Sequence, residues 1–158
     1  MNKKFELLLD DTITIFGIRL FRIKALISFG SVEEGEIGGY VEKEDNLSSS
    51  GNAWVSGNAW VSGNAWVSGD AEVSGNAWVS GDALVSGDAD YIVFKNNWSS
   101  GRYFTYTRSN KMWRVGCFYG TGQELIKKAY QDSEASGKHY EAYVEFVEKL
   151  EKLEEAND

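Results

Sequence analysis

Arginine and aromatic side chains are concentrated in one short stretch of this sequence, and this combination suits ligand binding. The set is Arg102, Phe104, Tyr106, Arg108, Trp113 and Arg114. The first four are spaced by two, so a β-strand would turn them toward one face, and the last two fall on the next expected strand. Guanidinium groups bind phosphates and aromatic rings stack on bases, which predicts a nucleotide-type ligand. The alternative is structural: the rings pack on helices while the arginines pair with an acidic tail.

Histidine and cysteine each occur once, and neither predicts an active site. His139 lies at the start of the last expected helix, where a solvated or capping role is expected. Cys117 falls on an expected strand and shares a face with Trp113, Val115 and Tyr119, which predicts a buried, inert thiol. A zinc site of the carbonic anhydrase type needs three histidines, so we expect no metal and no cofactor.

A six-residue repeat precedes these side chains and predicts the scaffold of the protein. From Gly51 to Ser86 the chain reads GNAWVS, GNAWVS, GNAWVS, GDAEVS, GNAWVS, GDALVS. Such short units can bury their apolar side chains only against the next unit. In each hexad Ala and Val are two residues apart, so both point inward on a strand and the residue between them points outward. Gly and Asn or Asp form the corners, because both accept the positive φ that a sharp turn needs.

This pattern resembles that of hexapeptide-repeat left-handed parallel β-helix proteins. The segment Val55-Ser56-Gly57-Asn58-Ala59-Trp60 matches their order of aliphatic, turn, small and free positions. The resemblance implies triangular coils of three hexads, stacked about 4.8 Å apart, and it alone supplies the handedness. The best-known enzymes on this fold are acyltransferases that use a histidine on a coil as general base. No hexad here contains histidine, so we expect no such activity.

In coils of three hexads, residues 18 apart lie on the same face. This rule stacks Trp60 over Trp78, Trp66 over Leu84, and Trp54 over Glu72. A large exposed apolar patch is unusual on a monomer, so we expect flanking segments or a second copy to cover the outward apolar residues. We therefore predict a homo-oligomer, either a trimer or a dimer. The alternative is an aromatic platform for a sugar, a base or a peptide.

The chain divides into three parts. We predict a β cap over residues 1–36, with strands at 4–9, 12–16 and 18–26. The hexapeptide-repeat β-helix takes residues 37–90, and it begins before the perfect repeat because Val41 and Leu47 are already six apart.

The third part, residues 91–158, is predicted to hold a small antiparallel sheet and two helices. Its strands are expected at 91–95, 102–108 and 112–120. Thr121 and Glu124 form a capping box, so a helix should start there and run to about Asp132. Gly137 is expected to break the helical region. The last helix carries an apolar stripe for the core or a subunit contact: Tyr140, Tyr143, Val144, Val147, Leu150 and Leu153. The fold class is therefore mainly β.

Charge is unevenly distributed along the chain, whose net charge is −8. The repeat and the C-terminal tail are acidic, whereas residues 91–138 carry 8 basic and 3 acidic side chains. A lone cysteine excludes an internal disulfide and suits a reducing compartment. Glu6 and Asp10 interrupt the N-terminal apolar residues, so we expect neither a signal peptide nor a membrane span. The expected location is the cytoplasm.

Three segments together look like a family of small proteins common in bacteriophages and prophages. They are RIKALISFGSVEEGEIGGYVEKEDNLS, the hexad repeat, and WRVGCFYGTGQELIKKAY, which span most of the chain. The resemblance implies no defined catalytic activity. It suggests a non-enzymatic binding protein that inhibits or sequesters a component of host antiviral defence, either a host protein or a nucleotide signal. The alternatives are a degenerate acyltransferase-like or sugar-nucleotide enzyme, and a structural element of a virion.

Overall fold

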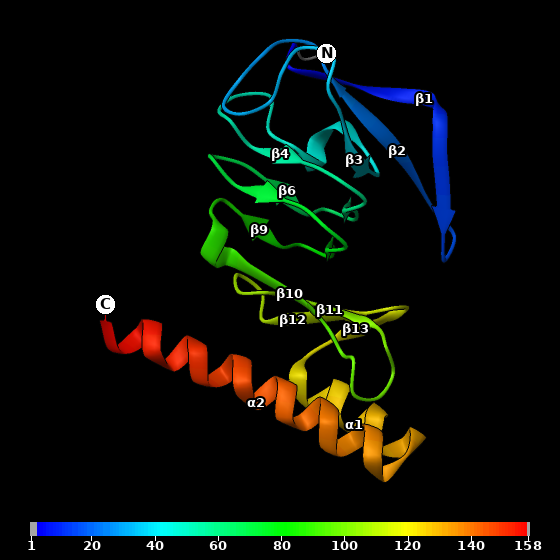
Figure 1. The fold of residues 1–158 in the computed structure, drawn as a ribbon, viewed down its shortest axis with the longest axis vertical. Helices are drawn as coiled ribbons and strands as arrows, with labels where there is room; N and C mark the ends of the chain where they lie inside the picture. Colours follow the sequence, from blue (N-terminus) through cyan, green and yellow to red (C-terminus); the bar gives the residue numbers. More distant parts are fainter. Residues whose placement is uncertain (1–2, 158) are drawn as a thin grey trace.

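Each hexad of the repeat forms one short strand that pairs in parallel with the strand 18 residues along. A computed structural model describes residues 3–157. The strands are β4 (Trp54–Val55), β5 (Trp60–Val61), β6 (Trp66–Val67), β7 (Glu72–Val73), β8 (Trp78–Val79) and β9 (Leu84–Val85). The pairs are β4–β7, β5–β8 and β6–β9, so the predicted stacking of outward residues is confirmed. Residues 51–86, here called the repeat stack, lie coil above coil in Figure 1.

The interior of the repeat stack is filled by its alanines and valines, as predicted. Every repeat alanine and valine is at most 1% exposed. The corners differ from the prediction in one respect. The six repeat glycines have positive φ, for example 66° at Gly63, whereas no described Asn or Asp does. Glycine alone therefore takes the left-handed conformation, because it has no Cβ to clash there.

The N-terminal part extends one side of the repeat stack. Strand β1 (Phe5–Ile15) pairs with β2 (Ile18–Ala25), β2 pairs with β3 (Ile37–Val41), and β3 pairs in parallel with β5. The predicted start of the coil before the perfect repeat is thus confirmed. The expected break at Asp10 and Asp11 is wrong, because β1 is continuous and absorbs these residues in an irregularity between Leu8 and Thr12. The β1–β2 hairpin runs down beside the stack (Figure 1).

The C-terminal part has one strand more than predicted. The sheet is β10 (Tyr91–Lys95), β11 (Tyr103–Thr107), β12 (Met112–Val115) and β13 (Phe118–Gly120), in that order and antiparallel. The expected strand 112–120 is therefore wrong: it folds back at Gly116, whose φ is +57°. Short 3₁₀ helices occupy Glu44–Asn46 and Asp88–Asp90.

Two helices follow the sheet. The capping box of α1 (Gly122–Asp132) is confirmed: Glu124 N donates to Thr121 Oγ1 at 3.2 Å, and Thr121 N donates to Glu124 Oε1 at 2.9 Å. The break before α2 (Glu134–Asn157) comes at Ser133, so the predicted break at Gly137 is wrong. Gly137 instead lies against the Tyr130 ring, where a Cβ would not fit, and this contact brings the two helices together.

The C-terminal sheet lies between the repeat stack and the two helices (Figure 1). Its helix-facing side forms a second core with α1 and α2: Phe104, Tyr106, Trp113, Val115, Leu125, Ile126, Ala129, Tyr140, Val144 and Val147. The apolar stripe of α2 therefore packs into this core over the N-terminal part of the helix. Farther along the helix, Leu150 and Leu153 are 38% and 61% exposed.

The last coil of the stack has no further coil to accept its N–H groups, and hydroxyls from beyond the repeat take that role. Trp78 N donates to Thr105 Oγ1 at 2.9 Å, and Leu84 N donates to Ser109 Oγ at 2.9 Å. Ser74 N donates to Tyr91 Oη at 3.3 Å. One hydroxyl thus serves each of the three sides, and the coil edge ends without unpaired donors at these positions.

We expect Thr105→Val to lower the free energy of unfolding by about 1–3 kcal/mol, because the buried N–H of Trp78 would lose the acceptor that it has among residues 3–157. Urea unfolding followed by tryptophan fluorescence measures the loss. The control is Ser109→Ala, whose bond to Leu84 is exposed, so water can replace the hydroxyl. Equal losses in the two variants would contradict the burial argument.

At the other end of the stack, β3 and Leu47 pair with only part of the first coil, and side chains donate to carbonyl groups outside that pairing. The buried ammonium of Lys4 donates to Ala53 O at 2.6 Å, to Ser48 O at 3.1 Å and to Ser50 O at 3.5 Å. Asn46 Nδ2 donates to Gly63 O and Ala65 O at 3.1 and 2.9 Å. Side-chain donors therefore satisfy carbonyl groups at the N-terminal end of the stack, and side-chain hydroxyls accept from N–H groups at its C-terminal end. This follows because the N–H groups of each coil donate to carbonyl groups of the next coil.

Candidate functional site

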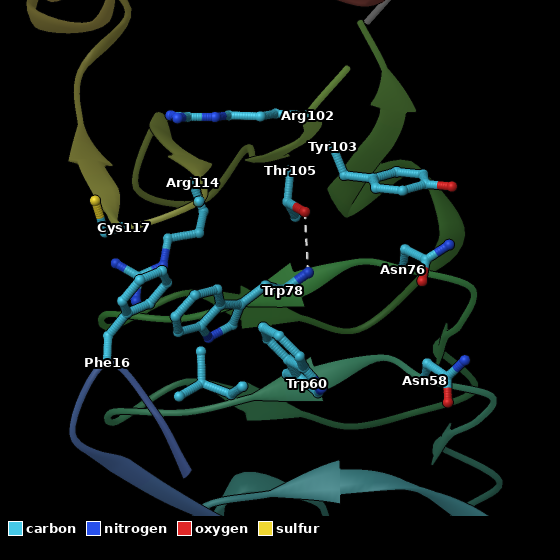
Figure 2. A pocket seen from close by; sticks show the side chains of 12 residues that line it. Phe16, Asn58, Trp60, Asn76, Trp78, Arg102, Tyr103, Thr105, Arg114 and Cys117 are labelled. Carbon is cyan, nitrogen blue, oxygen red and sulfur yellow. Dashed lines mark hydrogen bonds between the residues drawn. The ribbon is translucent and has the colours of Figure 1, made fainter. Parts of the chain in front are cut away.

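A groove of about 570 Å³ lies where the β1–β2 hairpin, the repeat stack and the C-terminal sheet meet (Figure 2). Three segments that are distant in the sequence supply its lining. It is lined by Ile15 and Phe16 of the hairpin, by Asn58, Trp60, Asn76 and Trp78 of the stack, and by Arg102, Tyr103, Thr105, Arg114, Gly116 and Cys117. We call this site the groove.

The stack contributes an aromatic floor to the groove. The 18-residue register places Trp60 against Trp78, edge to face, with ring centres 5.0 Å apart. Trp78 is buried and is held by a 2.7 Å hydrogen bond from its Nε1 to Ser62 Oγ. Phe16, at the hairpin turn with a φ of +49°, lies parallel to Trp78 at 5.9 Å. Trp60 is only half-buried, so part of its ring remains available for stacking.

Arg114 enters the groove from the sheet. Alternation along β12 turns Trp113 and Val115 to the helices and Arg114 to the stack. Its guanidinium carbon lies 3.5 Å from the centre of the Trp78 ring, a cation–π contact. Its Nε is buried and has no hydrogen-bond partner among residues 3–157. Burial lowers the pKa of Arg114, but a guanidinium stays protonated in proteins, so the charge remains.

Arg102 supplies a second cation at the same end of the groove. It is exposed, and its guanidinium lies over the β12–β13 turn, where Nη1 would be 3.8 Å from a Cβ placed on Gly116. In Figure 2 the guanidinium groups of Arg102 and Arg114 lie on the side of Phe16 and Cys117. No carboxylate within the described chain forms an ion pair with either arginine. This end of the groove is therefore positively charged.

Two asparagine side chains line the other end of the groove, opposite the guanidinium groups (Figure 2). Asn58 and Asn76 hold the same corner position in hexads 18 residues apart, so they stack like the tryptophans. Both are exposed, and neither amide hydrogen-bonds to another described side chain or backbone group. Tyr103, 41% exposed, lies above them.

The structure does not gather the six predicted ligand-binding residues on one face. Phe104, Tyr106 and Trp113 are at most 4% exposed and belong to the core under the helices, so they present no ring to a ligand. Arg108 faces the tail, with its Nε 3.8 Å from Glu151. The helices cover the more apolar face of the sheet, which carries Phe104, Tyr106 and Trp113. Alternation along β12 turns Arg114 to the opposite face, and Arg102 precedes β11 and so is not held to the face of Phe104. Only Arg102 and Arg114 reach the groove.

Glu151 neutralises the basic charge on the helix side of the sheet. Besides Arg108, it pairs with Lys111 Nζ at 3.2 Å and accepts the Tyr106 hydroxyl at 2.7 Å. Burial, together with this bond to Glu151, raises the pKa of Tyr106, so its hydroxyl stays protonated. The acidic tail thus pairs with one group of cations and leaves the two in the groove unpaired.

The outward residues of the repeat end in different environments. Trp54 is 1% exposed under the N-terminal part, with the Phe29 ring edge-on at 5.4 Å. Trp78 is 5% exposed in the floor of the groove. Trp66 and Leu84 are 45% and 55% exposed on another side. Flanking segments therefore cover part of the outward set, and coverage of the rest by a second copy stays a prediction.

Cys117 is exposed at the β12–β13 turn, so its expected burial on a strand is wrong. The sequence feature that indicates this turn is Gly116, which permits a two-residue turn between Val115 and Phe118. The sequence reasoning also missed Phe16 and the asparagines. The 18-residue rule alone aligns Asn58 with Asn76, but nothing local shows that a groove lies beside them.

The described part of the chain offers few other groups for catalysis or metal binding. His139 is half-buried on α2, with its Nδ1 2.7 Å from Ala135 O, and does not line the groove. Among residues 3–157, no three His, Cys, Asp or Glu side chains gather as metal ligands. The helices within that range are all too short or too polar to cross a membrane. Comparison of the chain with protein-family models and with curated proteins finds no match.

Proposed function

We propose that this protein is a non-enzymatic binding protein whose groove takes a nucleotide-type ligand, one with a planar ring and an anionic group. One observation carries the proposal: two guanidinium groups without carboxylate partners open onto partly exposed aromatic rings. Arginine binds phosphate oxygens in a bidentate manner, and aromatic rings stack on bases. The same two interactions were predicted from the sequence for a different set of side chains, of which Arg102 and Arg114 remain.

The biological setting we propose rests on the resemblance to small phage and prophage proteins. In that setting the protein would act in the host cytoplasm and sequester a nucleotide signal of host defence, or block a host protein that uses one. We further propose that the repeat stack is a left-handed parallel β-helix. Its 18-residue parallel register and its inward Ala and Val support a β-helix, and the handedness follows from the resemblance. Self-association through Trp66 and Leu84 is a separate proposal.

No observation favours the alternatives of an acyltransferase-like enzyme or a virion element. An acyltransferase of this fold uses a histidine on a coil, and His139 lies on α2. The groove contains one thiol, Cys117, but none of its other lining residues is an acid or a histidine that could activate it. Turnover of a thioester donor that depends on His139 would overturn the binding-protein proposal.

We expect AMP, CMP, GMP or UMP to bind in calorimetry, and Arg102→Ala to weaken the binding about 10- to 100-fold, since a charge-assisted hydrogen bond is worth about 1.5–3 kcal/mol. Arg102 is exposed and its guanidinium forms no ion pair within the described residues, so this change should leave stability unaltered. The matched control is Arg108→Ala, at the other end of β11, whose partner is Glu151. Binding that is lost equally in both variants would contradict the assignment to the groove.

Cys117 offers an independent readout, because it is the only cysteine of the chain and lines the groove. A bound nucleotide should slow its reaction with a thiol reagent, and the protection should disappear in Arg102→Ala. If none of the four nucleotides gives heat or protects Cys117 at millimolar concentration, the proposed function is wrong.

A further inference from the structure

The geometry points to adenine nucleotides as the ligand class of the groove, with Asn58 and Asn76 reading the edge of the base. This inference deepens the proposed function and rests on it. The groove is polar at two separated ends and aromatic between them (Figure 2). A mononucleotide has the same order of parts: a phosphate, a sugar, and a flat base whose far edge carries hydrogen-bonding groups.

The cationic end fixes the direction in which a nucleotide enters. Arg102 and Arg114 carry the only positive charges among the lining residues, so the phosphate belongs with them. The buried Nε of Arg114 lacks a partner within residues 3–157, and a phosphate oxygen would satisfy it. With the phosphate there, the base extends along Trp60 toward the corner asparagines. Trp60 and Tyr103 both keep exposed ring surface on this path.

The asparagine side chains at the other end of the groove then determine which base is preferred. An asparagine amide offers an acceptor and donors in one plane, which matches the N6 donor and N7 acceptor of adenine. Guanine presents two acceptors, N7 and O6, and suits arginine better. Both guanidinium groups lie at the phosphate end, away from Asn58 and Asn76 (Figure 2). The free amides therefore favour adenine over guanine.

Two asparagine amides lie at this end of the groove because corner residues 18 apart stack on each other in the repeat. Neither Asn58 nor Asn76 uses its amide to hold the described fold together, so neither is needed to shape the turn. Asn64, on another side of the stack, occupies the same hexad position but accepts from Lys43 Nζ at 2.7 Å. The amides in the groove are available for a ligand, whereas this equivalent one is engaged.

The test is calorimetry with AMP, GMP and ribose 5-phosphate on the full chain and on Asn58→Leu, Asn76→Leu and the double variant. We expect AMP to bind at least about 10-fold more tightly than GMP, as a bidentate base contact allows. The double variant should lose this preference and keep its affinity for ribose 5-phosphate. Asn64→Leu is the matched control, at the same hexad position but on another side of the stack and outside the groove, and it should behave like the unchanged protein.

The outcomes separate this inference from the proposed function. If nucleotides bind and need Arg102, but AMP and GMP bind alike or the double variant keeps the preference, the adenine assignment is wrong and the nucleotide groove stands. If no nucleotide binds and Cys117 is never protected, both are wrong. Thermal unfolding of each variant shows whether a loss of binding comes from a loss of folding, and binding to ribose 5-phosphate gives the same check.

Discussion

Lys4→Met should lower the free energy of unfolding by about 2–5 kcal/mol, because it leaves buried carbonyl oxygens without their donor. Lys4 is 2% exposed, and its ammonium donates to the carbonyls of Ser48 and Ala53 at the N-terminal end of the stack. It also lies 4.6 Å from the centre of the Phe29 ring. Methionine matches the length of the side chain and packs well, but it donates no hydrogen bond.

Urea unfolding measures this loss, and Lys3→Met is the control because Lys3 is exposed. The control should change stability by less than about 0.5 kcal/mol. If the two neighbouring substitutions cost the same, Lys4 does not cap the stack. A loss confined to Lys4→Met would show that the open coil edge needs a donor.

The contribution of Lys4 should also depend on pH. Burial lowers the pKa of Lys4 to about 8, whereas the unfolded chain keeps the ordinary value near 10.4. Between these two pKa values the Lys4 side chain holds its proton more often in the unfolded chain than in the folded protein. Lys4 therefore makes the free energy of unfolding rise with pH over this range. The gap in stability between the unchanged protein and Lys4→Met should therefore widen from about pH 7 to about pH 9.5. A constant or shrinking gap would mean that the pKa is not lowered.

Gly38→Ala is expected to destabilise the protein by about 3–5 kcal/mol or to prevent folding, because the added Cβ has no space. That Cβ would lie 2.5 Å from the backbone oxygen of Val55, 2.7 Å from Trp54 Cζ2 and 2.8 Å from Ile23 Cγ1. A backbone oxygen in a ladder cannot move aside as a flexible side chain can. Strand β3 would have to separate from the stack, and with it the hairpin that carries Phe16.

The matched control is Gly87→Ala, since Gly87 has an extended φ of −159° and no atom within 4 Å of a Cβ. This change should leave the urea midpoint almost unchanged. Circular dichroism and the yield of soluble protein show whether Gly38→Ala folds at all. A folded Gly38→Ala protein within about 1 kcal/mol of the unchanged one would contradict the close approach of β3.

Thr105 links the stability of the stack to the groove. Its hydroxyl accepts from Trp78 N while the residue itself lines the groove beside Arg102 and Arg114. The sheet whose strand β11 closes this coil edge is therefore also the sheet that places Arg114, on β12, over the Trp78 ring. For this reason, variants of Thr105 should change both unfolding and ligand affinity, whereas variants of Arg102 should change affinity alone.

The repeat determined most of the scaffold by itself. A period of six with Ala and Val two apart indicates which side chains point inward, and this followed from the residues alone. The 18-residue register, which the resemblance to hexapeptide-repeat proteins implied, is present in the structure. The capping box at Thr121 was equally local. The unforeseen turn at Gly116 and the continuous β1 depend on pairing partners, which the spacing of residues does not reveal.

Only the tertiary structure decided where the site lies. Alternation predicts that neighbours such as Trp113 and Arg114 face opposite ways, but not which face the helices cover. That choice buried Phe104, Tyr106 and Trp113 and turned Arg114 onto Trp78. The groove itself joins the hairpin turn, two coils and the β12–β13 turn. Contacts between segments so distant in sequence arise from tertiary packing, and a local sequence pattern does not predict them.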